Sequence, residues 1–184
     1  MKVYAVVGAK KNGNTDKLTQ QFVQGALSAG HEVDVDNLFT KKNLHGCIDC
    51  QGCKRNGGTC VWKDDMPEML EKLLAADVLV FASPVYFFSI SSQLKLFIDR
   101  SYAVIEKIRN KKFYFITTAE GSSESYAEDF KKVVEPIQGY LDNFEGMEFV
   151  ATIACYDMGS IKDVTKTAAW QEAYAAGTAI SAQG

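Results

Sequence analysis

The chain is poor in proline and histidine and carries little excess charge. Of its 184 residues, 3 are proline and 2 are histidine, and 20 basic residues nearly balance 23 acidic ones, for a net charge of −3. This balance argues against a basic nucleic-acid-binding surface, and a hydrophobic content of 47% argues against disorder. No apolar run reaches membrane-spanning length, and no signal peptide is recognisable. We therefore expect a cytoplasmic protein without nucleic-acid or membrane partners.

Short apolar runs alternate with helical patterns along the whole sequence. Continuously apolar segments such as VYAVV near the start fit parallel strands that are covered on both faces. We expect helices from residue 16, from 64 or 65, and over 91–107, 123–141 and 163–180. The expected strands are 2–7, 31–36, 77–83, 112–117 and 148–154. This pattern predicts an α/β fold: one domain over 1–184, with a doubly wound five-stranded parallel sheet in the order 2-1-3-4-5, helices on both faces, and a cysteine-bearing insertion at about 40–63.

The first loop, Gly8–Thr15 (GAKKNGNT), joins a buried strand to a helix. Such a loop leaves unpaired backbone N–H groups near the helix N-terminus, which favours a phosphate. The P-loop pattern fails because Asn14 and Thr15 follow Gly13, and the G-x-G-x-x-G pattern is absent. A plain turn before a capped helix is the competing interpretation of these residues.

Two further loops follow the third and fourth strands, at the sheet edge where open α/β folds bind ligands. The first, Ser83–Ser89, contains three consecutive aromatic residues, which suit packing against a flat ring or a subunit contact. The second begins at Thr117 and Thr118 and offers hydroxyl and backbone donors, although alone it reads as a helix cap. We expect a ligand at the switch between strands one and three.

Three motifs together carry a family resemblance: AKKNGNT at 9–15, ASPVYFFSISSQLKLFIDR at 82–100, and TTAEG at 117–121. Across essentially its whole length the chain resembles the NAD(P)H-dependent FMN reductase branch of the flavodoxin-like superfamily. Ala9 departs from the serine usual in that loop, and Lys10 from the usual proline. The resemblance implies a flavodoxin-like fold with bound FMN, residues 11, 12, 14 and 15 at the phosphate, residues 84–87 along the isoalloxazine, and residues 117, 118 and 121 near its pyrimidine end. By name the predicted cofactor-binding residues are Lys11, Asn12, Asn14, Thr15, Pro84, Val85, Tyr86, Phe87, Thr117, Thr118 and Gly121.

Four of the five cysteines form a C-x2-C-x2-C-x6-C pattern at Cys47, Cys50, Cys53 and Cys60. Two successive x2 gaps resemble the ligand run of a ferredoxin-type [4Fe–4S] cluster, and the same spacing occurs in the iron–sulfur flavoprotein subgroup. Zinc and free thiols remain as alternatives. Because the segment follows the second strand, we expect it at the same sheet edge as the flavin. Cys155, at the end of a strand, is expected to be a buried apolar residue.

The resemblance predicts an oxidoreductase in which FMN carries the chemistry, so that no side chain need act as catalytic acid or base. NADH or NADPH would be the electron donor, and a quinone, flavin, azo or nitro compound, or metal ion the small-molecule acceptor. The alternative is an iron–sulfur flavoprotein that carries electrons between redox partners. Because the aromatic run exceeds what one ring face needs, we also expect a homodimer or homotetramer that completes the active site.

Overall fold

The computed structural model describes residues 1–181, with the side chains of 123–129 left out of the description. Its centre is one sheet of five parallel strands in the order β2-β1-β3-β4-β5, as predicted. The strands are β1 (Lys2–Val7), β2 (Glu32–Asn37), β3 (Val78–Pro84), β4 (Lys112–Thr118) and β5 (Glu148–Cys155). The three central strands β1, β3 and β4 are almost wholly buried, which explains their continuous apolar sequences.

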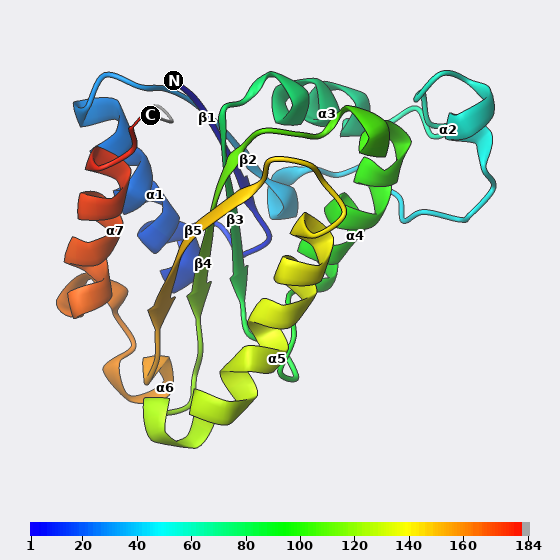
Figure 1. Ribbon diagram of the computed structural model, residues 1–184. Coiled ribbons are helices and arrows are strands. Elements are labelled where there is room, and N and C mark those ends of the chain that lie inside the picture. Colours follow the sequence, from blue (N-terminus) through cyan, green and yellow to red (C-terminus); the bar gives the residue numbers. More distant parts are fainter. Residues whose placement is uncertain (182–184) are drawn as a thin grey trace.

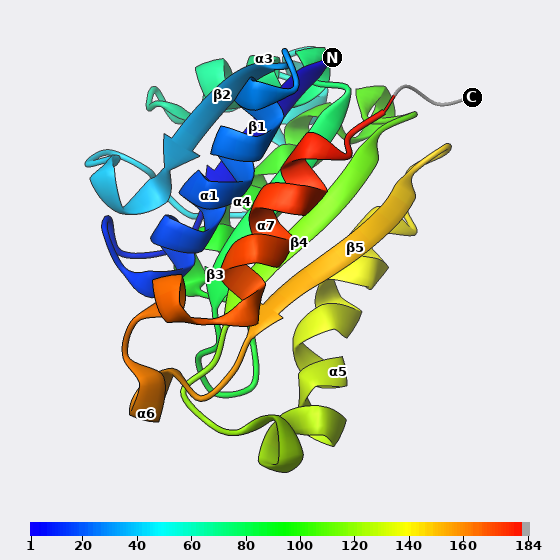
Figure 2. The ribbon, with the colours of Figure 1, turned by 90° about the vertical axis from the view of Figure 1, so that its left-hand side faces the viewer.

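Helices cover both faces of the sheet (Figure 1). One face carries α1 (Asn14–Ser28) and α7 (Ala168–Thr178), which lie side by side in front of the sheet in Figure 2. The other carries α3 (Met66–Ala75), α4 (Ser92–Ser101) with the 3-10 helix η2 (Tyr102–Lys107), and α5 (Ser123–Leu141). Two apolar cores result, one on each face of the sheet. Among the described helices, none is long and apolar enough to cross a lipid bilayer.

Close contact between α1 and α7 depends on two glycines. A Cβ at Gly25 would lie 2.1 Å from the Tyr174 carbonyl oxygen, and one at Gly177 would lie 2.1 Å from the Phe22 carbonyl oxygen. Both distances are far below van der Waals contact, so only glycine allows these two backbones to meet. The two helices therefore pack closely together, with α1 against β1 and β4 and α7 against β5.

Most predicted elements are confirmed to within a residue or two, and the differences are local. The expected helix over 91–107 changes to the 3-10 form after Ser101, and the helix expected over 163–180 divides into η3 (Val164–Lys166) and α7. Two short helices, α2 (Gly52–Arg55) and α6 (Met158–Ile161), and the 3-10 turn η1 (Leu38–Thr40) were not expected. Each is one turn of chain, too short to show helical periodicity in the sequence.

The cysteine segment, residues 40–63, does not lie where the sequence argument placed it. Its residues Lys54 and Gly58 lie beside Glu106 and Ala103 of η2, just before β4 begins. Figure 1 shows α2 projecting from the side of α3 and α4, away from the strand arrowheads. The expectation of a shared edge with the flavin loops is therefore wrong for a single chain: a segment this long runs back along the helical layer.

Candidate functional site

The first loop has an ordered turn and an N-terminus of α1 that no side chain caps. Gly13, the residue before the helix, has no side chain, and its amide donates to the Lys10 carbonyl oxygen (3.0 Å). Asn12 adopts a left-handed backbone, and its amide donates to the Asp16 carboxylate (2.9 Å). The first helical N–H groups therefore face the loop without a capping side chain, an arrangement that favours an anion.

Gly8 allows this loop to approach α4 closely. Its amide donates to the Ala82 carbonyl oxygen at 2.8 Å, continuing the pairing of β1 with β3. A Cβ at this position would lie 2.5 Å from Ser91 Oγ and 2.8 Å from the Leu94 Cβ. Any other residue would push the first loop away from the N-terminus of α4.

The second loop ends in a tight aromatic turn. Tyr86 and Ser89 exchange backbone hydrogen bonds of 2.9 and 3.0 Å, which closes a two-residue hairpin. Phe87 and Phe88, the central residues, have φ of +49° and +56°, a conformation that costs energy for residues with a Cβ. Phe87 is 101% exposed. A strained turn that holds an aromatic ring in solvent points to contact with a ligand or another chain.

Hydrogen bonds bring predicted residues from all three loops together. Thr15 Oγ1 lies 2.8 Å from Thr118 Oγ1, joining the first loop to the third, and both side chains are buried. The Val85 amide donates to the Thr118 carbonyl oxygen at 3.0 Å, joining the second loop to the third. The carboxyl ends of β1, β3 and β4 thus form one connected site, although Lys11 and Asn12 remain exposed at its rim.

Thr117 provides an independent indication that this edge receives a polar ligand. Its Oγ1 is buried and has no hydrogen-bond partner, one of two such side-chain atoms in the described part of the chain. A buried hydroxyl without a partner costs roughly 1–3 kcal/mol, and native structures rarely leave one. The donors, the uncapped helix and the aromatic turn together suit a molecule with a phosphate at one end and a polar ring at the other.

The chain after β5 also contributes, and sequence reasoning missed it. The Asn14 side chain donates to the Lys162 carbonyl oxygen (3.1 Å) and accepts from the Val164 amide (3.2 Å). The Asp157 amide donates to the Gly121 carbonyl oxygen (2.8 Å), so the turn around α6 supports the third loop as well. Since both atoms of the Asn14 side-chain amide already form hydrogen bonds, we expect the backbone N–H of Asn14 to bind a phosphate.

Asp16 is a second residue that the motif comparison overlooked. Its buried carboxylate accepts from the Asn12 amide (2.9 Å) and from Asn37 Nδ2 (2.9 Å), at the end of β2. It therefore fixes the first loop against the neighbouring strand. The sequence signal that could have identified it is an acidic residue in the first turn of α1, where a negative charge interacts favourably with the helix dipole.

The four cysteines of the segment line one small hollow of about 30 Å³ together with Trp62 and Tyr102. Gly52 lies within this group: a Cβ there would lie 2.4 Å from Val61 and 3.4 Å from Cys50 Sγ. Four thiols suit an iron–sulfur cluster chemically. The hollow holds little more than one water, however, and no three metal-ligating side chains among the described residues form an ion site. The donor set fits a cluster, but the segment must open to admit one. Cys155 is buried, as expected.

A buried ion pair fastens the base of this segment to α4. Arg100 donates through both terminal nitrogens to the Asp64 carboxylate, at 2.8 and 3.0 Å, and also to the His45 carbonyl oxygen. Burial alone would raise the pKa of Asp64, but the hydrogen bonds from Arg100 and from the His45 and Met66 amides, together with the Arg100 charge, outweigh burial, and the pKa is lowered. Asp64 also accepts from the amide of Met66, the first residue of α3, whereas the side chain of Asp65 at the N-cap position makes no capping hydrogen bond.

His45 and Trp62 close the neck of the segment. Their rings stack at 4.3 Å with an interplanar angle of 12°, and the Trp62 indole donates to the Gly46 carbonyl oxygen at 3.2 Å. The two aromatic rings and the pair of Arg100 with Asp64 thus hold the two ends of the segment together within one chain.

Comparison with known proteins agrees with the fold. Residues 1–177 match the family model described as a flavodoxin-like fold, and the chain belongs to that family. An iron–sulfur flavoprotein of Methanocaldococcus jannaschii is 38% identical over 102 residues, which cover 55% of this chain and 52% of that protein. The chain spans about half the length of the curated relatives first matched.

Two solved structures share the fold at low sequence identity. An NAD(P)H:quinone oxidoreductase from Methanothermobacter marburgensis superposes with a TM-score of 0.71 at 20% identity, covering 97% of this chain and 94% of that one. An FMN-dependent NADH-azoreductase from Bacillus anthracis, solved with FMN, gives 0.71 at 14% identity, covering 96% and 97%. At these identities the likeness establishes the architecture alone.

Proposed function

We propose that this chain is an FMN-dependent oxidoreductase that takes electrons from NADH or NADPH and passes them to a small-molecule acceptor. The observation that carries the proposal is the joined edge of β1, β3 and β4. There an uncapped helix N-terminus, a buried hydroxyl without a partner and an exposed aromatic turn meet. The names of two structures with the same fold, an NAD(P)H:quinone oxidoreductase and an FMN-dependent NADH-azoreductase, support the same class of reaction.

The protein's own residues would bind and orient the cofactor. The first N–H groups of α1, with Lys11 and Asn12 at the rim, would hold the phosphate, and Thr15 would fix the loop through Thr118. Pro84, Val85, Tyr86 and Phe87 would line the isoalloxazine, while Thr117 and Gly121 would meet its polar edge. When bound, FMN supplies the capacity to exchange a hydride with a nicotinamide and electrons with an acceptor.

An anaerobic titration tests the reaction. The protein, purified with FMN or supplied with it, is mixed with NADH or NADPH, and the visible flavin absorption is followed. We expect bleaching by one of the two nucleotides and recovery when a quinone or an azo dye is added. Fully bound flavin that neither nucleotide bleaches would refute the reductase activity. It would favour the alternative, an electron carrier between redox partners.

A second candidate function rests on the four cysteines in one hollow. We propose that they hold a [4Fe–4S] cluster, since the Methanocaldococcus relative is named an iron–sulfur flavoprotein. In this form the protein would carry electrons between redox partners. The test is anaerobic reconstitution with iron and sulfide. Broad visible absorption that a Cys50→Ser change abolishes, with FMN binding unchanged, would support the cluster. Stoichiometric zinc, or no metal, would refute it.

We also propose that the molecules pair as homodimers or homotetramers, with the aromatic turn in the contact. Tyr86, Phe87 and Phe88 are 51%, 101% and 43% exposed, a concentration of apolar surface uncommon on a monomer. Pairing would also be needed for the distant cysteine segment to approach a flavin. Light scattering of the FMN-bound protein should give twice or four times the chain mass, and a monomer mass would refute the proposal.

A further inference from the structure

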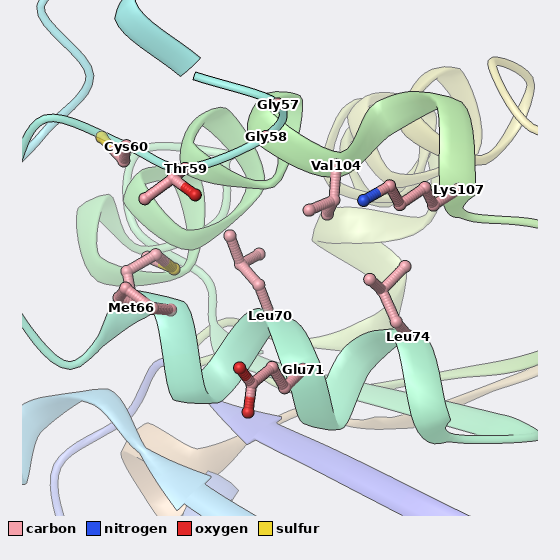
Figure 3. A pocket seen from close by; sticks show the side chains of 11 residues that line it. Gly57, Gly58, Thr59, Cys60, Met66, Leu70, Glu71, Leu74, Val104 and Lys107 are labelled. Carbon is pink, nitrogen blue, oxygen red and sulfur yellow. The ribbon is translucent and has the colours of Figure 1, made fainter. Parts of the chain in front are cut away.

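A separate cavity of about 200 Å³ lies between the cysteine segment and the helical body, away from the strand-end loops (Figure 3). Its volume equals that of about six or seven water molecules in the liquid, enough for a small organic molecule. Residues 57–60 form one wall, and side chains of α3 and η2 form the others. The functions proposed above make no use of this space.

The floor of the cavity is apolar. Leu70 and Leu74 of α3 and Val104 of η2 line it, and Leu70 and Val104 are themselves 5% and 8% exposed. In Figure 3 these three side chains face one another across the open space. A ligand that fills this space should carry an apolar group, since covering these apolar side chains removes their surface from water.

The wall opposite is thin because it consists largely of glycine backbone. Gly57 and Gly58 have φ of +60° and +97°, which glycine adopts without strain. A Cβ at Gly58 would lie 3.1 Å from the Ala103 carbonyl oxygen and 3.9 Å from Lys107 Nζ. These two glycines therefore let the segment cross η2 closely, with the Lys107 ammonium beside it.

Two opposite charges border the cavity, and neither is neutralised. Among the side chains that the structure describes, Lys107 and Glu71 have no ion-pair partner, whereas the nearby Lys54 and Glu106 pair with each other at 3.3 Å. Figure 3 shows the Lys107 amine next to Val104 above the floor, the Thr59 hydroxyl across from it, and Glu71 on the lower edge. The cation and the hydroxyl are thus available to an anionic group.

We propose that this cavity binds a small monocarboxylate with an aromatic or branched apolar body. Its carboxylate would pair with Lys107 and its body would lie on Leu70 and Val104. Glu71 would repel a second negative charge, so dicarboxylates are disfavoured. Because one wall belongs to the cysteine segment, a bound acid would join that segment to α3 and η2.

Benzoate is the probe for this site, since it has one carboxylate and a compact ring. Its affinity for the intact chain is measured by calorimetry or by amide NMR shifts, next to acetate, benzylamine and terephthalate. We expect benzoate to bind at least about tenfold more tightly than each of the three. Acetate lacks the apolar ring, benzylamine lacks the carboxylate, and terephthalate carries a second carboxylate that Glu71 would repel. The amide shifts should centre on 57–60 and 104–107.

Two substitutions should change the benzoate affinity in opposite directions. Lys107→Met should weaken benzoate binding about tenfold or more, whereas Glu71→Gln should strengthen it and admit terephthalate. Arg109→Met removes a nearby exposed cation that does not line the cavity, and it should leave the affinity unchanged.

The proposal fails if benzoate does not bind, if benzylamine binds equally well, or if Lys107→Met and Arg109→Met have the same effect. It also fails if the NMR shifts centre on the strand-end loops. None of these measurements involves flavin or NAD(P)H, so their outcome is independent of the reductase assignment.

Discussion

Arg100 and Asp64 form a bidentate ion pair whose side chains are 1% and 0% exposed. Arg100 belongs to α4 and Asp64 directly follows the cysteine segment, and in the described part of the chain no backbone hydrogen bond joins residues 40–64 to α4. Arg100 Nε is also buried without a hydrogen-bond partner in the described part of the chain. The pairs of Lys41 with Asp36 and of Lys54 with Glu106 also join the segment to the body, but the Arg100–Asp64 pair is buried more deeply than either.

Breaking the pair should be costly. Asp64→Asn or Arg100→Met leaves one buried charge unpaired, and we expect a loss of about 3–5 kcal/mol in the free energy of unfolding, measured in urea. The exposed pair of Lys95 and Asp99 is the matched control: Asp99→Asn should cost no more than about 0.5 kcal/mol. Equal effects at both pairs would contradict the assigned role.

The same pair predicts a pH dependence. Because Arg100 lowers the folded-state pKa of Asp64, the stabilisation is complete above the unfolded pKa of about 3.9 and is lost as the pH falls toward the folded value. The stability difference between wild type and Asp64→Asn should thus be constant from pH 7 to about 5 and shrink below pH 4. Urea unfolding at several pH values measures it. A difference that grows in acid would contradict the assignment.

Gly8 should tolerate no side chain. Gly8→Ala places a Cβ 2.5 Å from Ser91 Oγ, and we expect a loss of about 1–3 kcal/mol in stability together with weaker FMN binding, because the first loop moves. Gly139→Ala in α5 is the control, since a Cβ there meets nothing within 4 Å and alanine favours the helix by about 0.5–1 kcal/mol. Denaturation and FMN titration of both variants decide the matter.

The aromatic turn should lower the stability of the free protein and strengthen FMN binding. Phe87→Gly relieves a left-handed backbone without uncovering apolar surface, because the ring is already exposed, so the free energy of unfolding should rise by up to about 1 kcal/mol. FMN should nevertheless bind about two- to tenfold more weakly through loss of a ring contact. Asn110→Gly, also left-handed but remote from the site, should change FMN binding in neither direction. Unchanged FMN affinity in Phe87→Gly would show that the ring does not line the site.

Local sequence signals were sufficient for the sheet and for the three loops. Buried parallel strands leave continuous apolar runs, and Gly8, Pro84 and Thr117 each follow or end one of them, so their gathering at one edge follows from topology. The Thr15–Thr118 hydrogen bond could not be read in this way, because it joins residues 103 positions apart.

The path of the cysteine segment was the main error, and its cause is physical. Strand order fixes where a loop leaves the sheet, but 24 residues with few core side chains can run far along the surface. Its direction is set by contacts such as Arg100 with Asp64 and His45 with Trp62, which join distant positions. One-turn elements such as α6 were missed because hydrogen bonds to Asn14 and Gly121, and not periodicity, define that region.

The central claim is that the edge of β1, β3 and β4 binds FMN through its phosphate and its ring. Titration of the cofactor-free protein with FMN and with riboflavin, followed by flavin fluorescence, tests it most directly. We predict saturation at one FMN per chain and binding of riboflavin at least about tenfold weaker, since riboflavin lacks the group that the α1 N-terminus would hold. Equal affinity for the two flavins, or no binding of either, would contradict the account.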